Sequence, residues 1–255
     1  MSARDAREPA KEPAERRRGP DELEDSSWEK FKANMRTIGG AVLLAIFIRI
    51  VLFEAFEIDG PSMEPTLQHG DRVVVAKMLY GLFLPYTHEA VMTWGSPHLG
   101  DVVIVNSPAD GVDIVKRVIG VAGDTIEIRD GRILRNGDAV PHEVVEPCEL
   151  DEQKEEDPYC HIYEEQIGDV TYHVSHSERW EDYDRAPVVV PEGHIYVRGD
   201  HRDRSNDSTN PLIGPIPVSR VKGKALFIYL SCDERGGGGF LCGEFRWNRF
   251  FMTVD

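Results

Sequence analysis

A serine held between prolines is the first residue of this 255-residue sequence whose setting suggests chemistry. Ser62 lies in residues 60–67, with Pro61 directly before it and Pro65 shortly after it. Each proline ring fixes its own φ and biases the preceding residue toward extended geometry, so the backbone at Ser62 is stiff. A serine hydroxyl is a poor nucleophile until a neighbouring base takes its proton. The stretch therefore predicts a positioned nucleophile that needs a base.

Lys116 is the base that the sequence offers. Strand alternation in residues 113–120 places Lys116 on one face with Ile114 and Val118, and places Arg117 on the other face. Burial among apolar neighbours disfavours the ammonium form and lowers a lysine pKa from its usual value of about 10.4. A neutral amine near pH 7 can then act as a general base. A solvated lysine on an edge strand explains the same residues, and the pattern alone leaves both interpretations open.

A Ser-His-Asp hydrolase is the competing arrangement. It would be assembled from Ser62, Asp200 and either His69 or His201, but nothing in the sequence brings a histidine close to the serine. Asp200 belongs to a polar loop at residues 197–208, and turns favour such residues for local reasons. Residues 206–208 also match a glycosylation acceptor. The lysine arrangement needs no further assumption and is preferred.

Short β-branched runs bounded by Gly-Asp or Pro predict the elements that position these residues. The runs are residues 72–76, 101–106, 113–118, 125–129, 193–198 and 224–230. None has a helical period, and Asn136 followed by Gly137 predicts a tight hairpin turn. The expected fold class is mainly β, with an extracytoplasmic domain of twisted antiparallel sheets preceded by one N-terminal transmembrane helix.

Residues 37–56 are the only stretch long and apolar enough to enter a membrane. As a helix they would cover about 30 Å, the thickness of a hydrocarbon core, with Arg49 near the far end where it can reach the interface. A buried core helix is the alternative interpretation. Residues 1–36 are expected to be a disordered charged tail, because their mixture of charged residues, proline and alanine cannot bury enough surface to offset chain entropy.

The charges on either side of this stretch predict its orientation. Basic residues precede it (Lys30, Lys32 and Arg36) and acidic residues follow it (Glu54, Glu57 and Asp59). The positive-inside rule then places the N-terminus in the cytoplasm. Residues 57–255 would form an extracytoplasmic catalytic domain.

Composition excludes some functions. The net charge of -16 argues against binding nucleic acid, which requires a clustered basic surface. The four cysteines suit an oxidising location; pairing by proximity gives Cys148 with Cys160 and Cys232 with Cys242, although three connectivities are possible. Their spacing does not suit zinc, and His173 with His176 is more typical of a polar loop than of a metal site. Residues 141–187, acidic and rich in His and Tyr, are interpreted as an accessory insertion stapled by a disulfide.

Taken together, these segments closely resemble bacterial type I signal peptidases, the membrane-anchored Ser-Lys endopeptidases of the leader peptidase family. The likeness spans roughly residues 48–249, interrupted by the insertion. Residues 60–67 match the nucleophile box, 70–77 the following strand box, 116–124 the lysine box and 199–208 the late loop, while 214–217, 223–225 and 246–249 resemble the closing segments.

The resemblance implies a role for each matching residue. Ser62 would be the nucleophile, Lys116 the general base and Ser205 the hydroxyl that orients the lysine. The Ser62 backbone N–H would be an oxyanion donor, with Asp200, Arg202 and Asp207 bracing the site. Shallow apolar pockets for the small residues before the cleaved bond would be lined by Phe56, Ile58, Val73, Ile104 and Val115, with Met63 and Leu67 nearby.

The resemblance also implies the function. The expected activity is removal of signal peptides from exported preproteins after small-x-small residues, at the bacterial inner membrane, with preproteins and membrane lipid as partners and no metal or cofactor. An extended signal peptide would add as a strand to a sheet edge. Four positions depart from the common pattern: Gly60 for a serine that helps the oxyanion hole, His201 for Asn, Ala122 for Pro and Thr209 for Arg.

Three other functions are conceivable for a chain with these motifs. A self-cleaving repressor would need a DNA-binding module and a cytoplasmic address. An anchored scaffold or inactive paralogue would lack a residue of the dyad, whereas Ser62, Lys116 and Ser205 are all present. A maturation peptidase with one dedicated substrate stays open, since the acidic insertion could restrict access. The sequence does not indicate the oligomeric state or the preferred preproteins.

Overall fold

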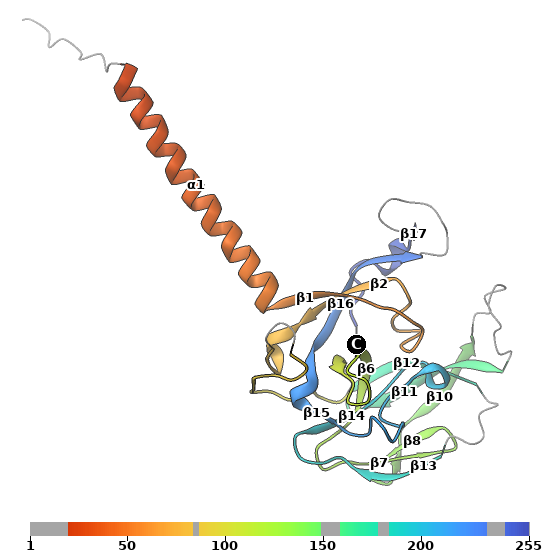
Figure 1. Cartoon of the computed structure of the whole chain (residues 1–255). Coiled ribbons are helices and arrows are strands. Elements are labelled where there is room, and N and C mark those ends of the chain that lie inside the picture. Colours follow the sequence, from red (N-terminus) through yellow and green to blue (C-terminus); the bar gives the residue numbers. More distant parts are fainter. Residues whose placement is uncertain (1–19, 84–86, 149–158, 178–183, 234–242, 255) are drawn as a thin grey trace, which may run out of the picture. The chain divides into compact units, whose positions relative to one another are not determined.

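The computed structural model describes residues 20–83, 87–148, 159–177, 184–233 and 243–254 (Figure 1). The chain divides into two compact units, residues 1–47 and residues 48–255. The first unit contains most of helix α1 (Pro20–Val51), and the second contains all the strands. The fold is mainly β with one N-terminal helix, as the sequence predicts.

Helix α1 differs from the predicted helix at both ends. It begins at Pro20, so residues 20–36 are helical rather than disordered, while residues 1–19 lie outside the described residues. It ends at Val51, so the prediction of helix through residue 56 is wrong: β1 (Phe53–Glu57) pairs with β2 (Asp71–Ala76). Strand pairing satisfies these backbone groups, which outweighs local apolar character. In the part of the chain that is described, no helix meets the length and hydropathy required of a membrane span.

The largest sheet contains eight antiparallel strands and carries both candidate catalytic segments. Its strand order is β1-β2-β16-β5-β6-β14-β15, with β17 paired to β16. The members not yet given bounds are β5 (Val102–Asn106), β6 (Asp113–Val121), β14 (His194–Arg198), β15 (Ile216–Pro217), β16 (Val221–Asp233) and β17 (Glu244–Phe245). Strand β16 shifts register against both neighbours, and such bulges bend a strand and increase its twist, so the sheet curls.

Smaller elements complete the domain. One sheet has the order β13-β7-β8-β9, another β10-β11-β12, and β3 pairs with β4. Their bounds are β3 (Gly81–Leu82), β4 (Met92–Thr93), β7 (Thr125–Arg129), β8 (Arg132–Arg135), β9 (Asp138–Ala139), β10 (His142–Pro147), β11 (Cys160–Ile167), β12 (Val170–Ser177) and β13 (Arg185–Val189). Short 3-10 helices are η1 (Lys77–Leu79), η2 (Arg202–Arg204), η3 (Val218–Arg220) and η5 (Trp247–Arg249).

The strand predictions are confirmed. Each of the six predicted runs overlaps one strand of the structure, with ends that differ by a few residues. The predicted hairpin turn joins β8 to β9, with positive φ angles of 57° at Asn136 and 91° at Gly137. Two successive positive φ angles give the turn that matches the twist of paired strands, which is why Asn-Gly is favoured there.

Residues 141–187 are part of the domain rather than a separate lobe. The described residues of this segment lie within the second unit, and β13 pairs directly with β7. Tyr163, Ile167, Tyr172 and Val174 share one buried cluster with residues of β6, β7, β8 and β14. The interpretation of this segment as an accessory insertion is therefore revised, because its strands build one of the domain's cores.

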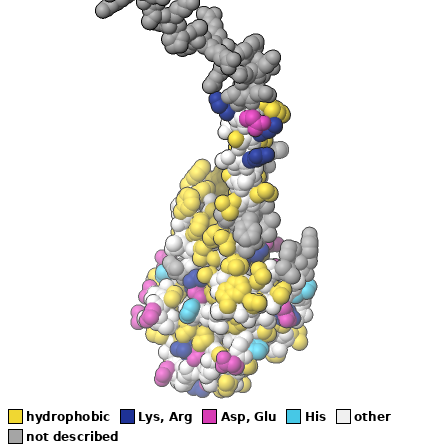
Figure 2. Space-filling view, turned by 90° about the vertical axis from the view of Figure 1, so that its left-hand side faces the viewer, with side chains coloured by type: hydrophobic (Ala, Val, Ile, Leu, Met, Phe, Trp, Pro, Cys, Tyr) yellow, Lys and Arg dark blue, Asp and Glu magenta, His cyan; other side chains and the backbone are white. Residues whose placement is uncertain are grey.

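Among the exposed large apolar side chains of the described domain, two groups lie close together in sequence. One is the β3–β4 hairpin with its flanks, at Leu79, Val91, Met92 and Trp94; the other is the C-terminal segment, at Phe245, Trp247, Phe251 and Met252. Figure 2 shows apolar side chains gathered over part of one face. Exposed apolar surface of this kind marks interaction sites more often than chance.

The C-terminal segment is fastened to the turn that follows Ser62. Asp71 is fully buried, and Arg249 donates from Nη2 to its Oδ2 at 2.6 Å and from Nε to its Oδ1 at 3.1 Å. The same Nη2 donates to the Thr66 carbonyl at 2.9 Å. Ser231 Oγ adds a hydrogen bond to Asp71 Oδ1 at 2.6 Å. One guanidinium thus ties residues 66 and 71 to the end of the chain.

Replacing Arg249 by methionine is expected to lower the free energy of unfolding by about 3–5 kcal/mol, because the buried Asp71 carboxylate loses its charged partner. Urea denaturation of both proteins measures the difference. Arg132→Met, at an exposed position of β8, serves as the control and should change stability by less than about 0.5 kcal/mol. Equal effects of the two substitutions would refute the conclusion that the Arg249–Asp71 ion pair stabilises the fold.

Candidate active site

Ser62 and Lys116 are in direct contact, as the sequence predicts. Lys116 Nζ donates a hydrogen bond to Ser62 Oγ at 2.7 Å, although 54 positions separate the two residues. Ser62 follows β1 in the turn before β2, and Lys116 lies in the middle of β6. The contact therefore depends on the curled sheet bringing these segments together. A hydroxyl hydrogen-bonded to an amine is the arrangement in which the amine can remove the hydroxyl proton.

Burial gives Lys116 the property that a base requires. Its side chain is among the buried polar groups, with 2% exposure, and its cross-strand partner Val103 is fully buried. Desolvation lowers the pKa of Lys116 to about 8, against the opposing effect of the Asp207 and Asp200 carboxylates, which raise it. Nζ also donates to the Val115 carbonyl at 2.8 Å, which fixes its direction. The buried-base interpretation is thus favoured over the solvated lysine.

The backbone around Ser62 is held from two sides. Leu67 N–H donates to the Met63 carbonyl at 2.9 Å, closing a turn just after the serine, and His201 N–H donates to the Ser62 carbonyl at 3.2 Å. Within the described residues, the Ser62 N–H has no hydrogen-bond acceptor. Because the Ser62 N–H lies beside the hydroxyl and has no such acceptor, it can donate a hydrogen bond to a developing oxyanion.

Gly199 lies close against this turn. A Cβ at position 199 would come within 2.4 Å of the Ser62 carbonyl oxygen and 2.2 Å of Ser205 Oγ. No side chain fits there, so the strand end and the nucleophile turn approach each other only because this residue is glycine. The sequence analysis did not single out Gly199, and a single glycine in a polar loop carries no signal of such an approach.

Ser205 contacts a different partner from the one expected. Its Oγ donates to Asp207 Oδ2 at 2.6 Å, whereas the resemblance implies that it orients Lys116. Asp207 also accepts from Gly199 N–H at 3.0 Å, and from both the N–H and the hydroxyl of Thr209. Thr209 therefore gives Asp207 two neutral hydrogen bonds, at the position where the resemblance implies an arginine. Ser205 and Asp207 both contact Gly199, which in turn packs against the Ser62 carbonyl, so both residues lie near the site.

Asp200 is braced by Arg117, which the sequence analysis placed on the opposite strand face and did not assign to the site. Arg117 donates to both carboxylate oxygens, from Nε at 2.9 Å and from Nη2 at 2.8 Å, and both side chains are 1% exposed. Thr66 Oγ1 donates to Asp200 Oδ2 at 2.6 Å. The ring of Tyr172 lies 4.2 Å from the guanidinium carbon of Arg117. The nearby carboxylate raises the Arg117 pKa against the effect of burial.

Arg202 pairs with Glu165, another residue that the sequence analysis missed. Its Nη1 and Nη2 donate to the two oxygens of Glu165 at 2.7 and 2.5 Å. Glu165 comes from β11, 37 positions earlier in the chain, so local sequence gives no sign of the contact. Arg202 and Asp200 are thus both buried in charge pairs, but with different partners.

The seven predicted pocket residues lie together. Phe56 packs against one hydrophobic cluster that contains Ile58, Met63, Leu67, Val73, Ile104 and Val115. All except Phe56 are nearly inaccessible to solvent. The structure therefore brings the predicted set together beside Ser62, as a packed apolar cluster. Their role as substrate pockets stays a prediction.

The histidines of the competing triad face other groups. His69 Nδ1 accepts a hydrogen bond from Gly60 N–H at 3.2 Å and lies 3.3 Å from Asp59 Oδ1. His201 Nδ1 lies 3.9 Å from Glu64 Oε2. Ser62 Oγ instead contacts Lys116, so the geometry favours the Ser-Lys arrangement. Among the described residues, no group of His, Cys, Asp and Glu is arranged to hold a metal ion.

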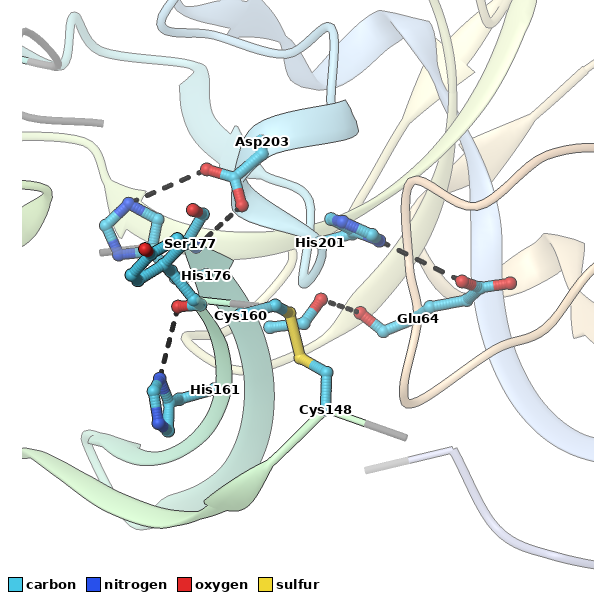
Figure 3. Close-up of a disulfide and its surroundings, with 10 residues drawn as sticks. Glu64, Cys148, Cys160, His161, His176, Ser177, His201 and Asp203 are labelled. Carbon is cyan, nitrogen blue, oxygen red and sulfur yellow. Dashed lines mark hydrogen bonds and ion pairs between the residues drawn. A yellow bond between two sulfur atoms is a disulfide. The ribbon is translucent and has the colours of Figure 1, made fainter. Parts of the chain in front are cut away.

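The disulfide predicted between Cys148 and Cys160 is present, and Figure 3 shows it in one view with Glu64, Ser177 and Asp203. Ser175 Oγ, on β12, donates to the Glu64 carbonyl at 3.1 Å, and Ser177 N–H donates to Asp203 Oδ2 at 2.8 Å. Strand β12, which pairs with the strand that begins at Cys160, thus contacts both the nucleophile turn and the late loop. Cys232 is also disulfide-bonded, and its predicted partner Cys242 lies outside the described residues.

Comparison with known proteins gives consistent matches. A family model described as signal peptidase, peptidase S26, matches residues 31–230. A protein named signal peptidase I from Pseudomonas fluorescens is 32% identical over 206 residues, covering 76% of this chain and 70% of that protein. One of the same name from Bacillus licheniformis is 34% identical over 194 residues, covering 76% and 86%. Signal peptidase I T from Bacillus subtilis (strain 168) is also 34% identical, covering 76% and 82%.

The pKa of Lys116 predicts how Ser62 reactivity depends on pH. Because the neutral amine is the base and its pKa is about 8, acylation of Ser62 by a small activated ester is expected to rise about tenfold between pH 7 and pH 9 and then level off. Mass spectrometry of the adduct gives the rate at each pH. Lys116→Ala should react slowly, without this inflection. A wild-type rate that does not change with pH over this range would exclude Lys116 as the base.

Proposed function

The chain belongs to the signal peptidase family, peptidase S26, and we propose that it cleaves preproteins with Ser62 and Lys116 as a catalytic dyad. Membership of this family makes it a peptidase that removes signal peptides, so its substrates are proteins that carry them. The observation that carries the dyad is the 2.7 Å contact between Lys116 Nζ and Ser62 Oγ. The lowered pKa of Lys116 supports it.

The proposed mechanism has two steps. Ser62 Oγ attacks the scissile carbonyl carbon while Lys116 accepts the hydroxyl proton, and the Ser62 N–H stabilises the oxyanion. Lys116 then passes the proton to the leaving amine, which departs with the mature protein. Water, deprotonated by the neutral Lys116, then attacks the acyl-enzyme ester; the bond to Ser62 Oγ breaks, Lys116 returns the proton to Ser62 Oγ, and the signal peptide leaves with a new carboxyl group. Asp207 and Asp200 face Lys116 and stabilise its transient positive charge.

The proposed specificity is for small residues one and three positions before the cut. An extended signal peptide adds beside a strand and directs alternate side chains toward the same surface. The apolar cluster of Ile58, Val73, Ile104 and Val115, with Phe56 packed against it, supports shallow pockets that leave room only for small side chains. A peptidase dedicated to one preprotein would share this chemistry and differ only in its range of substrates.

Membrane anchoring belongs to the proposal as well. We assign it to the apolar part of α1, with the N-terminus in the cytoplasm and the β domain outside. Ile38, Val42, Leu43 and Leu44 on this helix are each more than half exposed in the isolated chain, and lipid would cover them. Lys30, Lys32 and Arg36 precede them, which supports this orientation. The exposed apolar residues of the domain fit a location close to lipid.

Cleavage tests the function. Purified full-length protein in detergent is expected to release the mature part of a preprotein with an Ala-x-Ala site, whereas Ser62→Ala and Lys116→Ala should lose at least about a thousandfold in kcat/KM, because the nucleophile or its base is absent. Lys222→Ala, at a partly buried surface lysine on β16, is the control and should remain active. Cutting of one natural preprotein alone would favour the dedicated peptidase, and binding without cutting would favour the scaffold.

Anchoring has its own test. Wild-type protein expressed in bacteria should stay with the membranes after carbonate extraction, while Leu43→Lys combined with Leu44→Lys should shift it to the soluble fraction. Each lysine opposes insertion by about 2.5–3.5 kcal/mol at mid-membrane. Val144→Lys with Val145→Lys, an exposed apolar pair on β10, is the matched control. Extraction of the wild-type protein by carbonate would refute the anchor.

A further inference from the structure

Glu165 is a buried carboxylate near the site whose two oxygens are both held by neighbouring side chains. Besides the two hydrogen bonds from Arg202, it accepts one from Tyr172 Oη at 2.8 Å and contacts His142 Nδ1 at 2.8 Å. Its side chain is 1% exposed, so these four contacts replace water. Arg202 and His142 hold the pKa of Glu165 far below its usual range despite burial. Glu165 is therefore a fixed negative charge.

Arg202 connects the Glu165 carboxylate to the site. Its Nε donates to the Gly199 carbonyl at 3.2 Å, while its two terminal nitrogens are held by Glu165. The N–H of the same glycine donates to Asp207 Oδ2. Gly199 also packs against the Ser62 carbonyl and Ser205 Oγ. A displacement of Arg202 would therefore reach the nucleophile turn and the Asp207 carboxylate together.

The buried charges next to the site form ion pairs. Arg202 is neutralised by Glu165, and Arg117 by Asp200, with Tyr172 in contact with both pairs. The Asp207 and Asp200 carboxylates act on Lys116 by their charge and raise its pKa against the effect of burial. If Glu165 lost its charge, the buried cluster would gain one net positive charge.

We propose that Glu165 is a positioning residue for the Ser62–Lys116 site, which acts through Arg202 to hold Gly199 and the loop that presents Asp207. The inference rests on the proposed function, since it assigns a role within that site. It makes β11 and β12 part of the catalytic apparatus. Glu165 touches neither Ser62 nor Lys116, so it should affect turnover without forming part of the substrate-binding surface.

The proposal predicts an electrostatic signature. The groups that face Glu165 are Arg202 from η2, His142 from β10, and Tyr172 and His176 from β12. Those that face Lys116 are Ser62, Asp207 and Asp200. An unpaired Arg202 charge disfavours the ammonium form of Lys116. The acid limb of the pH profile should therefore move to lower pH when Glu165 becomes neutral, which simple loss of stability would not produce.

The experiment compares Glu165→Gln with Glu164→Gln in the full-length detergent-solubilised protein. Glu164 is the neighbouring, half-exposed residue of β11 and provides a matched loss of one carboxylate. Cleavage of an Ala-x-Ala preprotein is measured between about pH 6 and pH 10, per mole of Ser62 titrated by an acylating probe. We expect Glu165→Gln to lower kcat at least about tenfold with KM within twofold, and to shift the acid limb downward. Glu164→Gln should match wild type.

A double variant shows whether Glu165 acts through Arg202. Arg202→Met alone should reproduce the loss in kcat, and adding Glu165→Gln should lower kcat no further. Thermal unfolding of each variant identifies any that fails to fold; if Glu165→Gln fails, Glu165→Asp, which keeps the charge but shortens the reach, takes its place and should lower kcat without the acid-limb shift.

Three results would overturn the proposal: kcat per titrated site equal to the Glu164→Gln value, an acid limb that does not move in a folded Glu165→Gln protein, or losses that multiply in the double variant. Inactivity of the wild type would instead refute the proposed function. The two failures are therefore distinguishable.

Discussion

The proposed dyad depends on keeping the Lys116 amine out of water. Lys116 can remove a proton from Ser62 near neutral pH only if its ammonium form is disfavoured, and burial is the one effect here that disfavours it. Asp207 and Asp200 act in the opposite direction, so enclosure must outweigh two nearby carboxylates. The central position of β6 in a curled sheet, with β5 and β14 on its two sides, provides that enclosure.

Enclosing one amine places several other charges in the interior, and these are tolerated because each has a partner. Arg117 with Asp200, Arg202 with Glu165 and Arg249 with Asp71 are all buried or nearly buried ion pairs. Buried pairs of this type add little net stability compared with apolar residues, but losing one partner is severe. These ion pairs instead fix positions, because the hydrogen bonds of each pair hold a segment that contacts the nucleophile turn.

The partners come from distant parts of the chain. Residues 62–71 are held by β6, by the loop after β14, by β12 and by the C-terminal segment, which together span more than half of the sequence. The site therefore exists only when the whole domain has folded, and β12 contributes to its geometry as well as the strand that contains Lys116. A dyad that needs only two side chains for its chemistry is supported by four separate regions.

The sequence alone was enough to predict the contact between Ser62 and Lys116 and the class of fold. The stiff turn around Ser62, the apolar alternation around Lys116 and the β-branched runs are local patterns, and each led to the correct strand or contact. Local patterns could not identify Glu165 as the partner of Arg202, or Arg117 as the partner of Asp200, because any buried cation satisfies the same need and only chain topology chooses among them. The end of α1 was misjudged for a similar reason: residues 53–57 are apolar enough for helix, but pairing with β2 decides their conformation. Hydropathy reflects residues that are neighbours in the sequence, whereas strand pairing joins residues that are distant in the sequence and adjacent in the fold.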